Sequence, residues 1–125
     1  MEFALVIPLV LSLMLGTVQY SLYFWGRQTA AASAREAARR LAVGTYWECT
    51  QTEALLRVAN AGNGAVVTMR YDHAGNTAVI GSLVEVTVAM STLGPLLFPV
   101  PDRGAITEVA QSRVENIPAQ PLGCS

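Results

Sequence analysis

The chain opens with a long apolar run, MEFALVIPLVLSLMLGTVQYSLYFWGR, which holds one acid at Glu2 and no further formal charge until Arg27. A helix rises about 1.5 Å per residue, so about 23 residues reach roughly 35 Å and can cross a hydrocarbon core of about 30 Å. The run therefore predicts a transmembrane helix over residues 1–26. About 80 residues remain for a folded part, and a domain of that size commonly needs a staple or a partner.

Three interpretations of the apolar run differ in what happens to the helix. A cleaved secretory signal is disfavoured, because such signals have a shorter apolar region behind a basic one. A plain single-span anchor fits Tyr20, Tyr23 and Trp25, whose rings favour the membrane interface. A helix that first lies in lipid and then joins a helical polymer fits Pro8, which invites a kink, and Gly16, which allows close helix approach. Both residues are also ordinary in membrane spans, so the last two interpretations stay open.

The apolar helix is predicted to continue beyond the membrane as a stalk over residues 27–44. The stretch QTAAASAREAARRLAV contains strong helix formers and neither proline nor glycine. Glu36 precedes Arg40 by one helical turn, and Gly44 is well placed to end the helix. The result is one helix of about 40 residues, near 60 Å long. Its alanine-rich second half needs a packing partner, which is either the chain's own sheet or another helix.

Residues 45–125 are predicted to form a small α+β head. TQTEALLRVANAG indicates a short helix that opens at Glu48 or Thr52 and ends before Gly62. Two stretches alternate apolar and polar residues on either side of the turn DHAGNT, which predicts a hairpin. The apolar faces of these strands are Val67, Met69 and Tyr71, then Val84, Val86, Val88 and Met90. A weaker third strand is expected over residues 105–115, giving an antiparallel sheet of about three strands.

Two cysteines, Cys49 and Cys124, lie far apart in the predicted head. A metal site would need more ligands than these two and His73 readily supply, and a catalytic thiol would need a nearby base. A disulfide is the favoured interpretation, with two unpaired buried thiols as the alternative. A disulfide would place the head outside the cytoplasm. That placement conflicts with Arg27 as a cytoplasmic marker, unless a basic leader preceded Met1.

A proline-rich connection, LGPLLFPVPD, joins the last two expected strands. Its residues Leu96, Leu97 and Phe98 make it more apolar than a solvent-exposed loop tolerates. Either the loop folds over the sheet and completes the core, or it is a contact surface for a neighbouring subunit or a membrane. Both alternatives stay open.

No pattern in the sequence indicates an enzyme. The chain has no GxSxG, no HExxH and no glycine-rich phosphate loop, so neither a catalytic residue nor a cofactor is expected. A calcium site at Asp72, His73 and Asn76 is disfavoured, because calcium takes more oxygen ligands. A net charge of −1 without a basic stripe argues against nucleic acid as a partner.

The first 44 residues resemble the amino-terminal signature of TadE-like proteins, minor pilins or pseudopilins of bacterial tight-adherence pili. The first motif is matched by Glu2, Phe3, Ala4, Leu5, Val6 and Pro8, and the second is approximated by Ala34, Arg35, Glu36, Ala37 and Arg39. The resemblance implies a pilin-like fold and a structural subunit, minor or main, rather than an enzyme. It also implies a prepilin peptidase that removes a leader and an assembly platform. The protein would begin as a single-pass inner-membrane protein with its carboxyl terminus outside the cytoplasm and end in an extracellular pilus.

The same resemblance offers a role for Glu2. A carboxylate near the membrane core costs up to about 3 kcal/mol unless it is paired, and its expected partner is the free terminal amine of an adjacent subunit. Alternatively, Glu2 sits in the headgroup layer. We expect Glu2, Phe3, Pro8 and Gly16 to contribute to assembly with other pilin subunits. The rival hypothesis is a membrane-anchored binding, adhesion or accessory module that does not polymerise.

Overall fold

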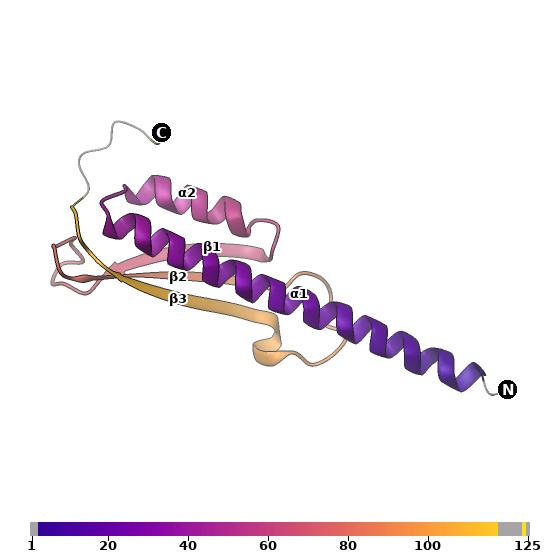
Figure 1. The fold of residues 1–125 in the computed structure, drawn as a ribbon. Coiled ribbons are helices and arrows are strands. Elements are labelled where there is room, and N and C mark those ends of the chain that lie inside the picture. The colour runs from indigo at the N-terminus through magenta and orange to yellow at the C-terminus, as the bar shows by residue number, and fades with distance from the viewer. Residues whose placement is uncertain (1–2, 118–123, 125) are drawn as a thin grey trace.

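A computed structural model describes residues 3–117 and 124. It shows one long helix that carries a small head, in which two helices cover one face of a three-stranded antiparallel sheet (Figure 1). The elements are α1 (Phe3–Ala42), α2 (Trp47–Val58), β1 (Asn63–Tyr71), β2 (Leu83–Ser91), the 3-10 turn η1 (Pro101–Gly104) and β3 (Ala105–Arg113). The predicted α+β, pilin-like arrangement is confirmed.

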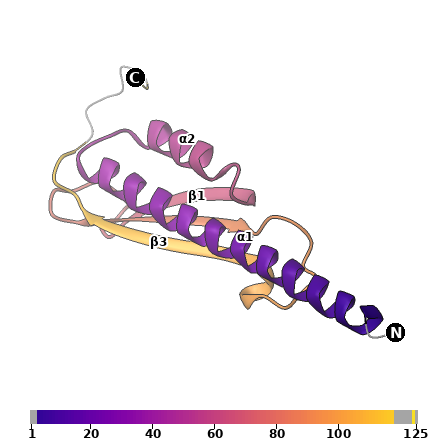
Figure 2. The same cartoon turned by 45° about the vertical axis from the view of Figure 1, so that its right-hand side comes forward.

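Helix α1 runs without a break from the exposed amino-terminal half into the head (Figure 2). It ends at Ala42, and Gly44 follows with a φ of 93°, a left-handed conformation that glycine adopts without strain. The amides of Gly44 and Thr45 donate to the carbonyls of Leu41 and Arg40, which satisfies carbonyls of the last turn. The glycine therefore ends the helix as its position in the sequence predicts.

The alanine-rich half of α1 packs on the chain's own sheet and on α2. Its buried residues recur every three or four positions and form one stripe: Gln19, Tyr23, Gly26, Ala30, Ser33, Ala34, Ala37, Ala38, Leu41 and Ala42. Most are small, so the helix backbone approaches the sheet closely. The chain's own sheet and α2 therefore cover the alanine-rich half of α1.

The sheet has strand order β1-β2-β3 and buries one face against the helices. Val67 of β1 pairs with Val88 of β2, and Thr87 on the other face pairs with Val109 of β3. The predicted apolar faces lie in the core: Val67, Val84, Val86, Val88, Met90 and Tyr71 are buried, and Met69 is partly buried against them. β3 ends at Arg113, two residues before the predicted end, and β1 begins at Asn63, directly after Gly62.

The structure joins Cys49 of α2 to Cys124 by a disulfide, with the two Cα atoms 5.3 Å apart. This is the predicted pairing. The bond closes a loop of 75 residues, so in the chain-entropy model it stabilises the fold by about 4 kcal/mol.

Replacing both Cys49 and Cys124 with Ser should therefore lower the free energy of unfolding by about 4 kcal/mol. The measurement is urea unfolding of the full chain in detergent micelles. The unmutated protein treated with dithiothreitol should show the same loss. Equal stability of the oxidised, reduced and double-serine proteins would contradict the role given to the bond.

Gly26 is required by packing, whereas Gly16 is not. A Cβ at Gly26 would lie 2.9 Å from Cδ1 of Ile106 and 3.0 Å from the carbonyl oxygen of Ala61, whereas a Cβ at Gly16 would meet only the Phe98 ring, at 3.8 Å. Gly26→Ala should lower the free energy of unfolding by about 1 to 3 kcal/mol through overpacking. Gly16→Ala is the matched control, with no loss expected because alanine favours the helix. Thermal unfolding in micelles measures the stability of both variants. Equal effects of the two substitutions would contradict the conclusion that packing requires a glycine only at position 26.

Candidate functional site

The amino-terminal half of α1 presents large apolar side chains on all of its faces. Those exposed by about half or more include Phe3, Leu5, Val6, Ile7, Leu9, Leu11, Leu13, Met14, Leu15 and Val18. A helix that is apolar all round and uncovered needs lipid or other helices around it. By length and composition α1 can cross a membrane, a test that secretory signals also pass, and only 6% of its most apolar window is buried.

The serine and threonine hydroxyls of this half make hydrogen bonds within the helix. Ser12, Thr17 and Ser21 each donate to the carbonyl four residues earlier, at 2.8 Å. The acceptor for Ser12 is the carbonyl of Pro8, and the helix continues through that proline. These hydroxyls therefore do not need water or a partner chain to be satisfied.

The structure places three of the four residues predicted to act in assembly. Phe3 is 81% exposed at the start of α1, Pro8 lies in the uncovered half, and Gly16 has the Phe98 ring of the same chain beside it. Glu2 lies outside the described residues. Phe3 and Pro8 thus lie on the bare surface, while Gly16 lies at its boundary with the head.

The apolar loop between β2 and β3 lies against α1 and is not part of the buried core. The Gln19 side chain is 6% exposed, and its Oε1 accepts hydrogen bonds from the amides of Leu97 and Phe98, both at 3.0 Å. Its Nε2 donates to the Phe98 carbonyl at 2.6 Å, and the Tyr20 hydroxyl donates to the Pro99 carbonyl at 2.6 Å. Four hydrogen bonds therefore fix the loop to one turn of α1.

Sequence reasoning missed Gln19. It is the one side-chain amide between Phe3 and Trp25, and that isolation was the available signal. An amide in an apolar helix needs partners, because an unsatisfied buried polar group costs about 1 to 3 kcal/mol. The loop supplies them from 79 residues away. Leu96 and Leu97 remain 48% and 61% exposed, so the loop adds apolar surface beside the bare helix.

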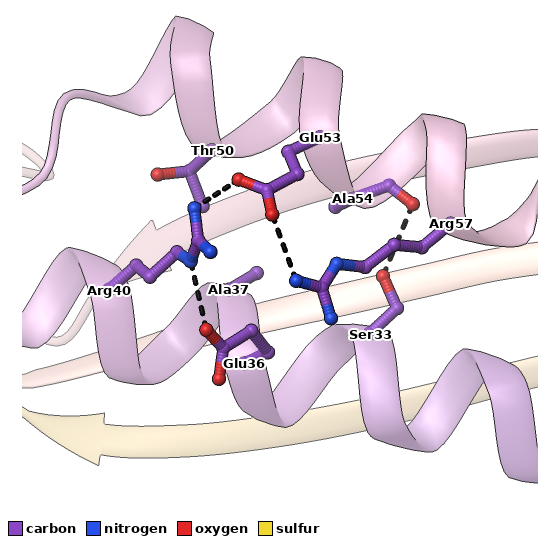
Figure 3. A pocket seen from close by; sticks show the side chains of 8 residues that line it. All are labelled: Ser33, Glu36, Ala37, Arg40, Thr50, Glu53, Ala54 and Arg57. Atoms are coloured by element: carbon purple, nitrogen blue, oxygen red, sulfur yellow. Dashed lines mark hydrogen bonds and ion pairs between the residues drawn. The ribbon is translucent and has the colours of Figure 1, made fainter. Parts of the chain in front are cut away.

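A cluster of charged side chains joins α1 to α2 (Figure 3). Arg40 lies between Glu36, at 2.9 Å, and Glu53, and Glu53 also pairs with Arg57 at 2.8 Å. Beside them the Ser33 hydroxyl donates to the Ala54 carbonyl at 3.2 Å. Each acid faces a cation, which leaves no free base or nucleophile within this cluster. The cluster holds the two helices together.

The pKa of the Glu36 carboxyl is lowered from its ordinary value of 4.5, chiefly by the hydrogen bond from Arg40. The pKa of Arg40 is raised, chiefly by the same hydrogen bond. Both shifts favour the charged pair. They are the shifts of a structural ion pair on a helix surface rather than of a tuned acid and base.

In the turn that carries Asp72, His73 and Asn76, the side-chain amide of Asn76 stabilises the turn itself. The Asn76 Oδ1 accepts a hydrogen bond from the backbone amide of Tyr71 at 2.6 Å, and Asn76 has a φ of 53°. A search of the described residues finds no group of three or more His, Cys, Asp or Glu side chains that could hold a metal ion. The hydrogen bond and the backbone conformation of Asn76 are those of a hairpin turn.

Comparison with known proteins identifies the amino-terminal segment. A family model described as TadE-like protein matches residues 1–39, which confirms the resemblance over that segment. The matched residues span the bare half of α1 and most of the stripe that packs on the sheet. Searches of curated proteins and of solved structures give no match.

The charged cluster should make stability depend on pH. The folded state lowers the pKa of Glu36, so the ion pair with Arg40 contributes fully to the free energy of unfolding above the ordinary pKa of 4.5. This contribution is lost as the pH falls through the lower pKa that Glu36 has in the folded protein. Glu36→Gln should lower the free energy of unfolding by about 0.3 kcal/mol at pH 7, as for helix pairs one turn apart. Thermal unfolding of both proteins between pH 7 and 3 should show this difference shrinking in acid.

The control for that experiment is Asp72→Asn, which removes a charge from an exposed position of the turn between β1 and β2. It should change the unfolding temperature little at any of these pH values. A difference between the Glu36→Gln protein and the unmutated protein that stays constant from pH 7 to 3 would rule out the pair as its source.

Proposed function

We propose that this chain is a structural subunit, of the minor pilin or pseudopilin kind, of a bacterial tight-adherence pilus. The observation that carries the proposal is the division of α1 into an uncovered apolar half and a half packed on the head. The match of residues 1–39 to the TadE-like family model supports the same role, since it covers the uncovered half of α1 and most of the packed half. Assembly by helix bundling, without a catalytic step or cofactor, is the proposed mechanism.

The first stage of the proposed mechanism is in the inner membrane. Residues 1–26 cross the bilayer, residues 27–44 form the stalk and residues 45–125 form the head. The disulfide between Cys49 and Cys124 supports a head outside the cytoplasm, because such bonds persist in oxidising compartments. A prepilin peptidase and an assembly platform act on the chain at this stage.

The second stage is transfer of the helix from lipid into a filament. The exposed side chains between Phe3 and Val18 then pack on the same segment of neighbouring subunits. Glu2 pairs with the terminal amine of an adjacent subunit, and this pair sets the axial offset between the two. An ion pair in a low-dielectric surrounding discriminates strongly against registers that leave one charge alone.

A second candidate function is favoured by the same bare helix. One span and a small head suffice for a membrane-anchored binding, adhesion or accessory module that never polymerises. The two functions differ in where the mature protein is found. A subunit leaves the membrane with the filament, and an anchored module does not.

Shear fractionation tests the proposal. Filaments sheared from cells that express the chain with its pilus system should contain it, identified by mass. Glu2→Gln should leave membrane insertion intact and reduce the sheared fraction at least about tenfold, since one unpaired charge costs more than about 1.4 kcal/mol. Glu48→Gln, a charge removal on the exposed face of α2, is the matched control and should assemble normally.

Each result has a distinct meaning. A chain that stays entirely with membranes while filaments form would support the anchored module. Full incorporation of the Glu2→Gln protein would show that the acid does not set the register. Loss of the Glu48→Gln protein from filaments would mean that charge removal in general, rather than at Glu2, affects assembly.

A further inference from the structure

We propose that the loop of residues 93–100 is a membrane-contact segment that enters the lipid beside α1 before assembly. This inference rests on the membrane stage of the proposed function, and goes beyond it by giving the head itself a lipid-facing surface. The partner is the boundary between lipid headgroups and acyl chains. Three independent features of the described residues lead to this partner.

The first feature is the length of the bare helix. Counted from Phe3, where the apolar run begins after the charged Glu2, the 16 residues to Val18 rise about 24 Å, less than a hydrocarbon core of about 30 Å. A span of about 20 residues reaches Leu22, and tilting of the helix would lengthen the span further. The loop contacts α1 at Gly16, Gln19 and Tyr20, inside that span. A helix that crosses the bilayer therefore brings the loop to membrane depth.

The second feature is the pairing of peptide groups at the centre of the loop with side chains of α1. Irregular backbone at membrane depth is tolerated only where its N–H and C=O groups have partners in the protein. The amides of Leu97 and Phe98 donate to Gln19, and the carbonyls of Phe98 and Pro99 accept from Gln19 and Tyr20. Pro95, Pro99 and Pro101 have no N–H to satisfy. Four peptide groups at the centre of the loop therefore have partners in the protein, which suits a segment at the boundary between headgroups and acyl chains rather than in the hydrocarbon core.

The third feature is the distribution of charge. No charged residue lies between Ser91 and Pro101, and the exposed side chains of Leu96 and Leu97 adjoin the bare helix. The first charges beyond the loop are Asp102 and Arg103. On the helix the first is Arg27, which pairs with Glu108 of β3 at 2.7 Å. Trp25, 46% exposed, lies just before Arg27, where aromatic rings favour the membrane interface.

Nuclear magnetic resonance of the full, disulfide-bonded chain in phosphatidylcholine nanodiscs tests the inference. Two paramagnetic probes are compared: a nitroxide on the lipid acyl chain near the headgroup, and a gadolinium chelate in water. The amide signals of residues 96–98 should be lost with the lipid probe and retained with the chelate. The hairpin turn at residues 72–76 is the internal control and should show the reverse.

The outcomes separate this inference from the proposed function. If signals of residues 3–18 are lost with the lipid probe but the loop responds to the chelate, the span holds and the loop inference is overturned. If residues 3–18 do not respond to the lipid probe, the membrane stage itself fails. A loop protected from both probes is covered by protein, which also overturns a lipid partner.

Two variants sharpen the test. Gln19→Leu keeps the helix apolar and removes three hydrogen bonds to the loop, so the loop signals should become sensitive to the chelate; Gln28→Leu, at an exposed position of α1, is its control. Leu97→Ser should weaken the effect of the lipid probe on the loop without disturbing the fold. Its control is Ile80→Ser, since Leu97 and Ile80 are 61% and 62% exposed. Unchanged loop signals in both Gln19→Leu and Leu97→Ser would contradict the proposal.

Discussion

Close packing of the small-residue stripe of α1 on the sheet is the constraint on which the rest of the structure depends. Gly26 and Ala30 let the helix backbone lie against β2 and β3, where Val86, Val88 and Ile106 are almost fully buried. Because this packing fixes the second half of a continuous helix, the first half must project beyond the head. The exposed apolar surface is therefore held in a defined direction by the core, with the loop at Phe98 supporting the helix at the boundary between its two halves.

The interactions that stabilise the head and the candidate functional surface lie at opposite ends of the molecule. The charged cluster around Arg40 and the disulfide at Cys49 both hold α2 in place, on the side of the head remote from the bare helix. Surface ion pairs contribute little, typically below about 1 kcal/mol, so the disulfide stabilises the head more than the charged cluster does. The features that suit contact with lipid or with other subunits lie instead at the opposite end, on the first half of α1 and the loop beside it.

Local patterns in the sequence predicted most of the fold. The unbroken helix, the hairpin faces and the end at Gly44 follow from periodicity, propensity and backbone chemistry within a few residues. What packs on the alanine-rich half could not be predicted, because both a sheet and a partner helix suit small residues. The attachment of the loop to Gln19 was also out of reach, since it joins residues 79 positions apart through backbone groups that no side-chain pattern reveals. Glu2 was singled out by its charge, and its role stays a prediction.

The hydroxyl bonds within the bare half of α1 have a consequence for movement between surroundings. Ser12 and Thr17 donate their protons to carbonyls of their own helix, so neither side chain must exchange a hydrogen bond when its neighbours change. Replacing lipid tails by other helices then exchanges mainly dispersion contacts, which differ little between the two. The free-energy difference along this segment is small and is spread over many weak contacts. Such a segment can move from one apolar medium to another gradually, without a single large barrier from a bond that must break first.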